Sequence, residues 1–174
     1  MGHDLGGQTR IMDGDDDGSL IVDIGAYEAE YTEPEIVCVD DDWAGLPPGT
    51  LVMGQCYAYE GPLVFGYDAF ASIQDGIDAA VYYGGVCVSE GIYVENITIT
   101  KSDLKIEGAG SHVTVIDGNH SGPVVTTSGV TTNGLFRGFT LINGEFGFGG
   151  GMYNSGSSLY VLNCIFQANH ADAG

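Results

Sequence analysis

Apolar residues two positions apart recur along this chain from Val86 onward, and turn-forming residues separate one pair from the next. A spacing of two is typical of short β-strands that bury one face. Glycine accounts for 29 of the 174 residues, which favours a fold with many tight turns. The sequence therefore predicts an all-β protein. The pairs are Val86/Val88, Ile92/Val94, Ile97/Ile99, Leu104/Ile106, Val113/Val115 and Phe139/Leu141.

One internal repeat indicates how these strands are arranged. Residues 138–144 (GFTLING) align with residues 163–169 (NCIFQAN) at an offset of 25 positions. That offset is about the length of one coil of a β-solenoid, in which equivalent residues stack on one another. Alternation alone also suits a β-sandwich or an up-and-down barrel, but the repeat favours the solenoid. The inward-facing stacks that it predicts are Cys164 over Phe139 and Phe166 over Leu141.

A single helix is predicted just before the strands. Asp68 is a candidate N-cap, and Gly84-Gly85 ends the segment. The apolar residues between them fall at i, i+3, i+7 and i+11, which gives a helix one apolar face. A lone amphipathic helix in this place suits a cap over the end of a β-structure. The apolar residues are Phe70, Ile73, Ile77 and Val81, and Gln74, Asp75 and Asp78 form the other face.

Composition divides the chain into three parts. Residues 1–30 form an acidic segment, residues 31–67 a linker and entry loop, and residues 68–174 the helix and the strands. No stretch approaches the ~20 apolar residues of a membrane span, so membrane insertion is not expected. The N-terminus lacks the basic and apolar regions of a signal peptide, so either a leader has been removed or the chain is a piece of a longer protein.

The charge of the chain limits its partners. The formal net charge is −20, and 13 of the 24 carboxylates lie in residues 1–42. Nucleic acids and anionic membranes are poor partners, because binding them needs clustered Lys and Arg, of which only four are present. Divalent cations are better partners, because such dense carboxylates repel one another unless they are neutralised. A solvated acidic surface is the alternative.

The best candidate for a ligand site is the acidic run in residues 13–19 (DGDDDGS), which follows the D-x-D-x-D-G pattern of calcium loops. An EF-hand is excluded, because Ile24 stands where that loop needs a bidentate glutamate. A looser Ca²⁺ loop is predicted, and a solvated acidic turn is the alternative. Its ligands would be Asp13, Asp15 and Asp17, completed by Asp23 or a backbone carbonyl.

A second acidic run, Asp40 to Asp42, is a weaker cation candidate. A charged strand end with Trp43 packed beneath it is the favoured interpretation. The histidines have no ligand spacing, so a zinc site is not expected. They are His3, His112, His120 and His170.

The four cysteines form no C-x-x-C motif and allow three disulfide pairings, among which the sequence does not choose. Cys164 is predicted to be a core residue. A disulfide between two of Cys38, Cys56 and Cys87 suits an exported protein, and buried free thiols are the alternative.

Residues 37–174 resemble the N-terminal half of right-handed parallel β-helix proteins of the pectin-lyase-like superfamily, which are common in exported bacterial proteins. The resemblance lies in a series of short motifs in a fixed order, and it is specific for the fold rather than for an activity. It implies an all-β, right-handed parallel β-helix (solenoid) with one short N-terminal capping helix. The motifs are VDDDW (39–43), FASIQDGIDAA (70–80), GVCVSEGIYVENITI (85–99), LKIEGAG (104–110), VIDGN (115–119), GFTLING (138–144) and GGGMYN (149–154).

Residues 4–28 resemble the segment that closes the C-terminal end of such a β-helix, although here that segment comes first. Two explanations remain open. The chain is a fragment across the junction of two tandem modules, or residues 1–30 of one copy cover the open end of the next. The second arrangement does not close on itself and builds a filament. The expected partner is therefore another copy or a neighbouring module of a longer chain.

The resemblance also raises the question of polysaccharide chemistry. Lyases of this superfamily generally need carboxylate-held Ca²⁺ and a Lys or Arg base on a groove along the helix. The available bases are Arg10, Lys101, Lys105 and Arg137, and nothing in the sequence places Arg137 beside a carboxylate cluster. A hydrolase needs paired carboxylates, for which solvated rim residues are the favoured interpretation. The candidates are Glu90, Glu95, Glu107 and Asp117.

The function expected from the sequence is that of a non-enzymatic structural or adhesive β-helix module, extracellular or at the cell surface. It would assemble head-to-tail through residues 1–30 and carry Ca²⁺. The alternative is a fragment of a carbohydrate-binding or polysaccharide-degrading β-helix protein.

Overall fold

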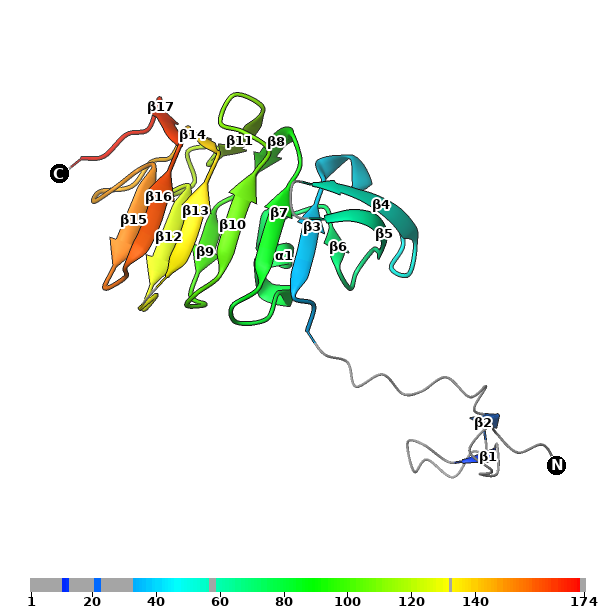
Figure 1. Cartoon of the computed structure of the whole chain (residues 1–174). Helices are drawn as coiled ribbons and strands as arrows, with labels where there is room; N and C mark the ends of the chain where they lie inside the picture. The colour runs from blue at the N-terminus through cyan, green and yellow to red at the C-terminus, as the bar shows by residue number, and fades with distance from the viewer. Residues whose placement is uncertain (1–10, 13–20, 23–32, 57–58, 132, 173–174) are drawn as a thin grey trace. The chain divides into compact units, whose positions relative to one another are not determined.

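A computed structural model gives the fold of the chain (Figure 1). It describes residues 11–12, 21–22, 33–56, 59–131 and 133–172. The chain divides into two compact units, residues 1–32 and residues 33–174. In the first unit, β1 (Ile11–Met12) pairs antiparallel with β2 (Ile21–Val22).

The second unit consists of short strands, one 3-10 turn and one α-helix. Its first elements are β3 (Ile36–Val39), η1 (Asp41–Trp43), β4 (Leu51–Cys56), β5 (Tyr59–Val64), β6 (Ala69–Phe70) and α1 (Ile73–Ala79). The strands that follow are β7 (Gly85–Val88), β8 (Gly91–Val94), β9 (Ile97–Ile99), β10 (Lys105–Gly108), β11 (Thr114–Asp117), β12 (Val125–Ser128), β13 (Gly134–Arg137), β14 (Thr140–Ile142), β15 (Met152–Ser155), β16 (Leu159–Leu162) and β17 (Ile165–Gln167).

From β7 onward, each strand pairs in parallel with the strand three places later in the chain. This pattern produces three parallel sheets, which we call the front sheet (β6-β3-β7-β10-β13-β16), the second sheet (β8-β11-β14-β17) and the third sheet (β9-β12-β15). From β7 onward, strands of the same sheet lie side by side in the order of the chain, whereas β6 lies beyond β3 at the end of the front sheet (Figure 1). The prediction of an all-β fold with one α-helix is confirmed for the described residues.

The register of the strands confirms the repeat seen in the sequence. Leu141 pairs with Phe166 and Thr140 pairs with Ile165, an offset of 25 positions. Other strand pairs have offsets that differ from 25. Gly85 pairs with Lys105, 20 positions later, and Lys105 pairs with Leu135, 30 positions later. The turns between strands therefore absorb differences in length while the strands keep their pairing.

Inward-facing side chains of the front sheet form one continuous column. Its members occupy paired positions on five successive strands, and all except the last are almost fully buried. They are Val37, Val86, Ile106, Phe136 and Val161. The ring of Phe136 also stacks on that of Phe139, with centroids 4.5 Å apart. Such stacking removes apolar surface from water at every strand and stabilises the sheets together.

Residues 31–67 were predicted to be a linker and entry loop, but β4 and β5 lie within this range and form strands. Strands β4 and β5 make an antiparallel hairpin, which aligns Val52 with Leu63. A second apolar cluster lies beneath this hairpin, where Leu63 contacts Cys38 and Cys87 on the outer face of β3 and β7. These two strands are buried on both faces for that reason, and both carry an unbroken Val-Cys-Val run. A Gly- and Pro-rich composition concealed the hairpin in the sequence.

The predicted start of the helix is also wrong. The helix begins after Ser72, whose side chain accepts a hydrogen bond from the Asp75 N–H, and it ends at Ala79. Asp68 instead accepts a hydrogen bond from the Val64 N–H, in the turn that follows β5. Phe70 belongs to β6, where its backbone pairs with Val39 of β3. Strand pairing with β3 therefore overrides the helical spacing at this end.

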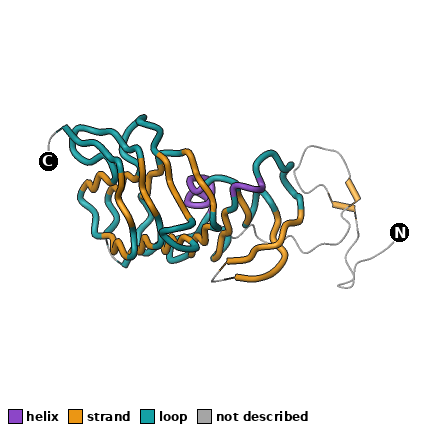
Figure 2. Tube along the Cα trace, turned by 90° about the horizontal axis from the view of Figure 1, so that it is seen from above, coloured by secondary structure: helices purple, strands orange, loops and turns teal. Residues whose placement is uncertain are grey.

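Helix α1 lies near the first strands of the front sheet (Figure 2) and packs against β3, β6, β7 and β9. Ile73 and Ile77 enter the main core from this helix. Gly76 allows a close approach to β3, since a Cβ atom at this position would lie 2.7 Å from Val39 Cγ2. At the end of the helix, Lys101 Nζ donates to the carbonyl oxygens of Asp78 and Ala80. The helix is thus fixed to the strands along its length and at its C-terminus.

The core column predicts a large difference between two neighbouring substitutions. Phe136→Ala should lower the free energy of unfolding by about 3–5 kcal/mol, because it leaves a cavity between stacked strands. Leu135→Ala, on the outer and half-buried side of the same strand, should cost about 1 kcal/mol. Urea unfolding of both variants, followed by circular dichroism, measures the difference. Equal losses would contradict the assignment of the inward face.

Candidate functional site

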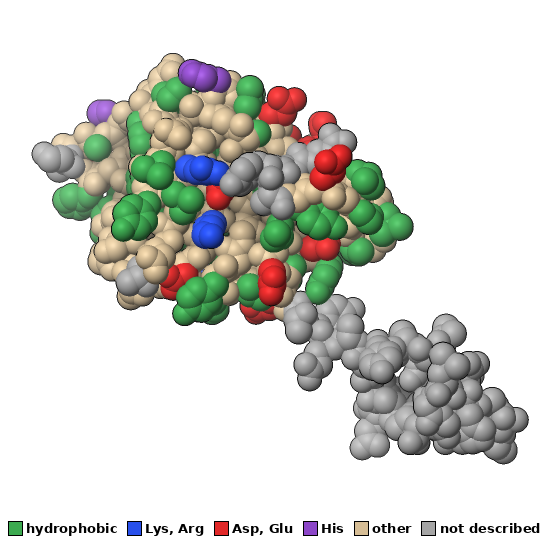
Figure 3. All heavy atoms as spheres, viewed as in Figure 1, with side chains coloured by type: hydrophobic (Ala, Val, Ile, Leu, Met, Phe, Trp, Pro, Cys, Tyr) green, Lys and Arg blue, Asp and Glu red, His purple; other side chains and the backbone are tan. Residues whose placement is uncertain are grey.

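The outer face of the front sheet carries three of the charged residues considered as candidates in the sequence, Lys105, Glu107 and Arg137. Lys105 and Arg137 lie on this face, and two basic side chains are visible near its middle in Figure 3. Strand pairing aligns Glu107 with Arg137. The guanidinium donates to Glu107 Oε2 through Nε at 2.7 Å and also through Nη2. Arg137 therefore forms an ion pair with Glu107, in a contact that the sequence did not reveal.

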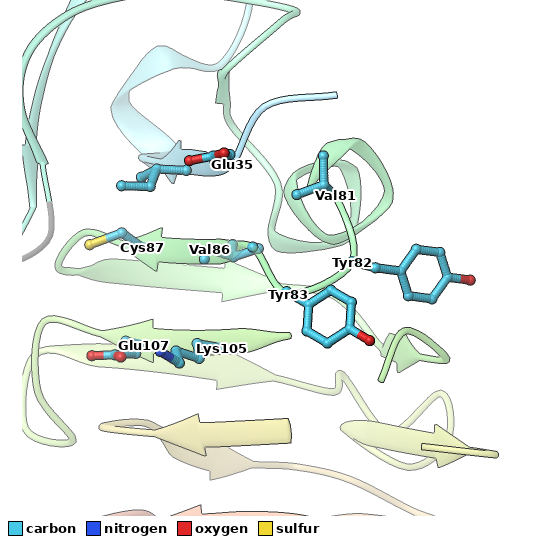
Figure 4. Close-up of a pocket in the computed structure, with 11 residues that line it drawn as sticks. Glu35, Val81, Tyr82, Tyr83, Val86, Cys87, Lys105 and Glu107 are labelled. Atoms are coloured by element: carbon cyan, nitrogen blue, oxygen red, sulfur yellow. The ribbon is translucent and has the colours of Figure 1, made fainter. Parts of the chain in front are cut away.

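A depression of about 500 Å³ lies at one end of these strands (Figure 4). Its walls are the starts of β3, β7 and β10 and the turn that joins α1 to β7. Glu35, Lys105 and Glu107 supply its charged groups. Tyr82 and Tyr83 are 59% and 78% exposed, and their rings lie on the side opposite Cys87 and Glu107. This combination of exposed aromatic rings and charged groups was not predicted from the sequence.

The turn that presents the two tyrosines has an unusual backbone. Tyr83 adopts a φ of +68°, a left-handed conformation that is uncommon for an aromatic residue. A Cβ atom on Gly84 would lie 2.9 Å from the carbonyl oxygens of Glu35 and Val81, so this position accepts only glycine without rearrangement. The pair Tyr82-Tyr83 directly before Gly84-Gly85 is the sequence signal that marks this turn.

A second depression, of about 570 Å³, lies on the same face and shares Cys87 and Glu107 with the first. Its walls include Arg137, Asn163 and the turn at 108–113 that follows β10. The two depressions therefore flank the Glu107–Arg137 ion pair along the outer surface of the front sheet.

We considered groups of three His, Cys, Asp or Glu side chains as possible metal sites. Among the described residues, the acidic run Asp40–Asp42 is the one such group whose ligand atoms lie within 4.8 Å of one another. Its side chains also have structural roles. Asp40 accepts a hydrogen bond from the Asp42 N–H and caps η1, and Asp41 accepts one from the Ile92 N–H. Burial raises the pKa of Asp40, and hydrogen bonds from Asp42 and Ser89 oppose that shift. Trp43 is half-buried against the second apolar cluster, as the favoured interpretation of the sequence requires.

The carboxylates considered for hydrolase chemistry are mostly engaged in the scaffold. Glu107 binds Arg137, and Asp117 accepts hydrogen bonds from the Asn119 N–H and from Asn143 Nδ2. Glu95 accepts the backbone N–H groups of Ile73 and Gln74, at the start of α1. Their positions are therefore explained by strand pairing, turn formation and helix capping.

The acidic calcium motif lies outside the described residues. The residues concerned are Asp13, Asp15, Asp17 and Asp23. Arg10, one of the candidate bases, also lies outside the described residues. The calcium loop stays a prediction of the sequence.

The cysteines fall into two classes. Cys87 is disulfide-bonded, whereas Cys38 and Cys164 carry thiol groups. Burial, with a smaller contribution from the charge of Asp68, raises the pKa of Cys38 to about 11. Burial also raises the pKa of Cys164, which packs against the main core as predicted. Neither thiol is poised for nucleophilic chemistry at neutral pH, because the reactive species is the thiolate.

No family model, no curated protein and no solved structure matches the chain. The resemblance to the pectin-lyase-like superfamily therefore stays a prediction from the short motifs of the sequence. Among the described residues, the single α-helix is too short to cross a membrane.

The pKa of Glu95 predicts how the stability of the protein depends on pH. Burial raises its pKa, and the two backbone hydrogen bonds oppose the shift without cancelling it. The folded state therefore holds the proton more tightly than the unfolded state, and stability falls as pH rises from the ordinary glutamate pKa, about 4.3, through the raised value. The free energy of unfolding of the wild type minus that of Glu95→Gln should decrease over this range. Chemical denaturation of both proteins at several pH values measures it, and a difference that grows with pH would refute the assignment.

Proposed function

We propose that residues 33–172 form the first coils of a right-handed parallel β-helix that serves as a structural and adhesive module of an exported protein. The observation that carries the proposal is the three-strand period, in which each coil contributes one strand to each parallel sheet. Right-handed crossovers are the rule for parallel strands, because the twist of the strands returns the chain to the sheet in that hand. The short α1 at the first strands acts as the cap of the β-helix.

The use of charged residues supports a structural role. In the described residues, Glu95, Glu107 and Asp117 each bind partners on another coil or element. Lys101 closes the C-terminus of α1. A catalytic base and a paired acid need to be available to a substrate, whereas these groups are occupied by the scaffold. The disulfide at Cys87 supports a location outside the cytoplasm, where disulfides persist.

The last strand of each parallel sheet offers a surface for assembly. Among the described residues, β15, β16 and β17 have a neighbour on one side only. Val161 and Phe166 continue the inward columns of the front and second sheets and are only partly covered. Unpaired strand edges with exposed apolar groups bind a further strand in register. We propose that residues 1–30 of another copy cover this edge, since residues 4–28 resemble the closing segment of a β-helix.

This arrangement predicts concentration-dependent filaments. Phe166→Asp should reduce assembly strongly, because it places a charge where the next coil packs. Gln167→Asp should have little effect, because that side chain is exposed and adjoins Phe166 on the same strand. Light scattering across a concentration series and electron microscopy of each variant provide the measurement, with circular dichroism to check folding.

A chain without residues 1–30 separates the proposed occupant from other contacts, and it should remain monomeric. A wild-type chain that stays monomeric at the highest concentration would exclude the filament. A truncated chain that still assembles would exclude residues 1–30 as the occupant.

Carbohydrate binding is the second candidate function, and the depression beside Tyr82 and Tyr83 favours it. Exposed aromatic faces give sugar rings an apolar surface to pack on, and Glu35 and Lys105 provide hydrogen-bonding groups at the same place. A module that adheres to polysaccharide would need such a surface.

A glycan array with added Ca²⁺ tests this candidate. Tyr83→Ala should lower the signal for a bound glycan by about 10-fold, the range expected for the loss of a stacking residue. Tyr160→Ala is the matched control, because Tyr160 is 63% exposed on the front sheet but lies outside this depression. An array without binding, together with no lyase activity on acidic polysaccharides, would exclude the carbohydrate function.

A further inference from the structure

Three residues with metal-binding side chains occupy one column of turns. His120, Glu145 and His170 are separated by 25 positions each, and each lies three residues beyond a strand of the second sheet. The register of that sheet aligns Asp117 with Ile142 and Ile142 with Gln167. The same offset therefore places the three residues on successive coils, with Glu145 between the two histidines.

Backbone hydrogen bonds hold the column together across all three coils. The N–H of His120 donates to the Asn143 carbonyl at 2.8 Å, and the N–H of Glu145 donates to the Gly122 carbonyl at 2.9 Å. Glu145 and His170 are bridged as parallel partners, and the His170 N–H donates to the Gly144 carbonyl at 2.8 Å. Neighbouring coils are thus fixed at the strand spacing of about 4.8 Å. The three Cα atoms form a rigid base for their side chains.

The side chains already form two contacts between imidazole and carboxylate. His120 Nδ1 lies 3.3 Å from Glu145 Oε2, and His170 Nε2 lies 3.0 Å from Asp172 Oδ1. Both separations are those of hydrogen-bonded ion pairs. Among the described residues, no three of these four side chains bring their ligand atoms within 4.8 Å of one another, so a shared ion requires them to turn. The four side chains are 53–79% exposed, which leaves them free to rotate toward a shared ion.

We propose that His120, Glu145 and His170 bind one divalent transition-metal ion of the zinc type, with Asp172 as the fourth ligand. Two imidazoles and two carboxylates favour Zn²⁺ over Ca²⁺ or Mg²⁺, which take oxygen ligands. The net charge of −20 attracts cations to the surface. The ion joins three successive coils and thereby ties the turns of the second sheet together.

Calorimetric titration of the intact chain with Zn²⁺ at pH 7, in excess Ca²⁺ to occupy sites made only of oxygen ligands, tests the proposal. The wild type should bind one Zn²⁺ ion in the column. His120→Ala and His170→Ala should each weaken that binding about 10-fold or more, and Glu145→Gln should also weaken it. All three residues are exposed, so the variants should keep the circular dichroism spectrum of the wild type.

Three control variants each remove one other nitrogen or sulfur ligand. His112→Ala, His3→Ala and Cys164→Ser should each leave the affinity of this site within about twofold of the wild-type value. In NMR spectra, the ring signals of His120 and His170 should shift on addition of Zn²⁺ while that of His112 does not. A wild-type chain without saturable Zn²⁺ binding would overturn the proposal. So would unchanged affinity in both His120→Ala and His170→Ala.

Discussion

Parallel pairing between each strand and the strand three places later is the constraint on which the rest of the second unit depends. It fixes the inward column from Val86 to Val161 and aligns Glu107 with Arg137 on the outer face. It also places the turns that follow paired strands next to one another. Each strand is only a few residues long, so no strand is stable alone, and the sheets are stable because neighbouring strands and facing sheets bury one another's apolar side chains.

Much of this fold could be predicted from local patterns, because the alternation of apolar residues is itself a local property. The pairing of Leu141 with Phe166 follows directly from the repeat of 25 positions. The hairpin of β4 and β5 could not be predicted in this way, because it is stabilised by the outer faces of β3 and β7, which are distant in sequence. The helix start at Ser72 has the same origin, since pairing with β3 draws Phe70 into a strand.

The candidate site was harder to predict than the fold, because the number of residues between paired strands varies along the chain. Glu107 and Arg137 are 30 positions apart and meet by strand pairing, whereas the repeat in the sequence is 25. The depression beside Tyr83 depends on a left-handed backbone turn, and the tyrosine pair alone does not specify one. Glu95 and Lys101 bind the two ends of α1, because the chain lies beside the helix again after β8 and after β9.

The histidines show how a coil repeat changes the meaning of spacing in a sequence. Metal motifs are usually recognised by ligands a few residues apart on one helix or loop, so His120 and His170 look unrelated at a distance of 50 positions. Strands β11, β14 and β17 of the second sheet pair at an offset of 25 residues, so that distance spans two such offsets, and Glu145 follows the strand between them. In parallel sheets of this kind, residues separated by the offset of paired strands are spatial neighbours, so ligand sets are found by searching at the offset of each strand pair.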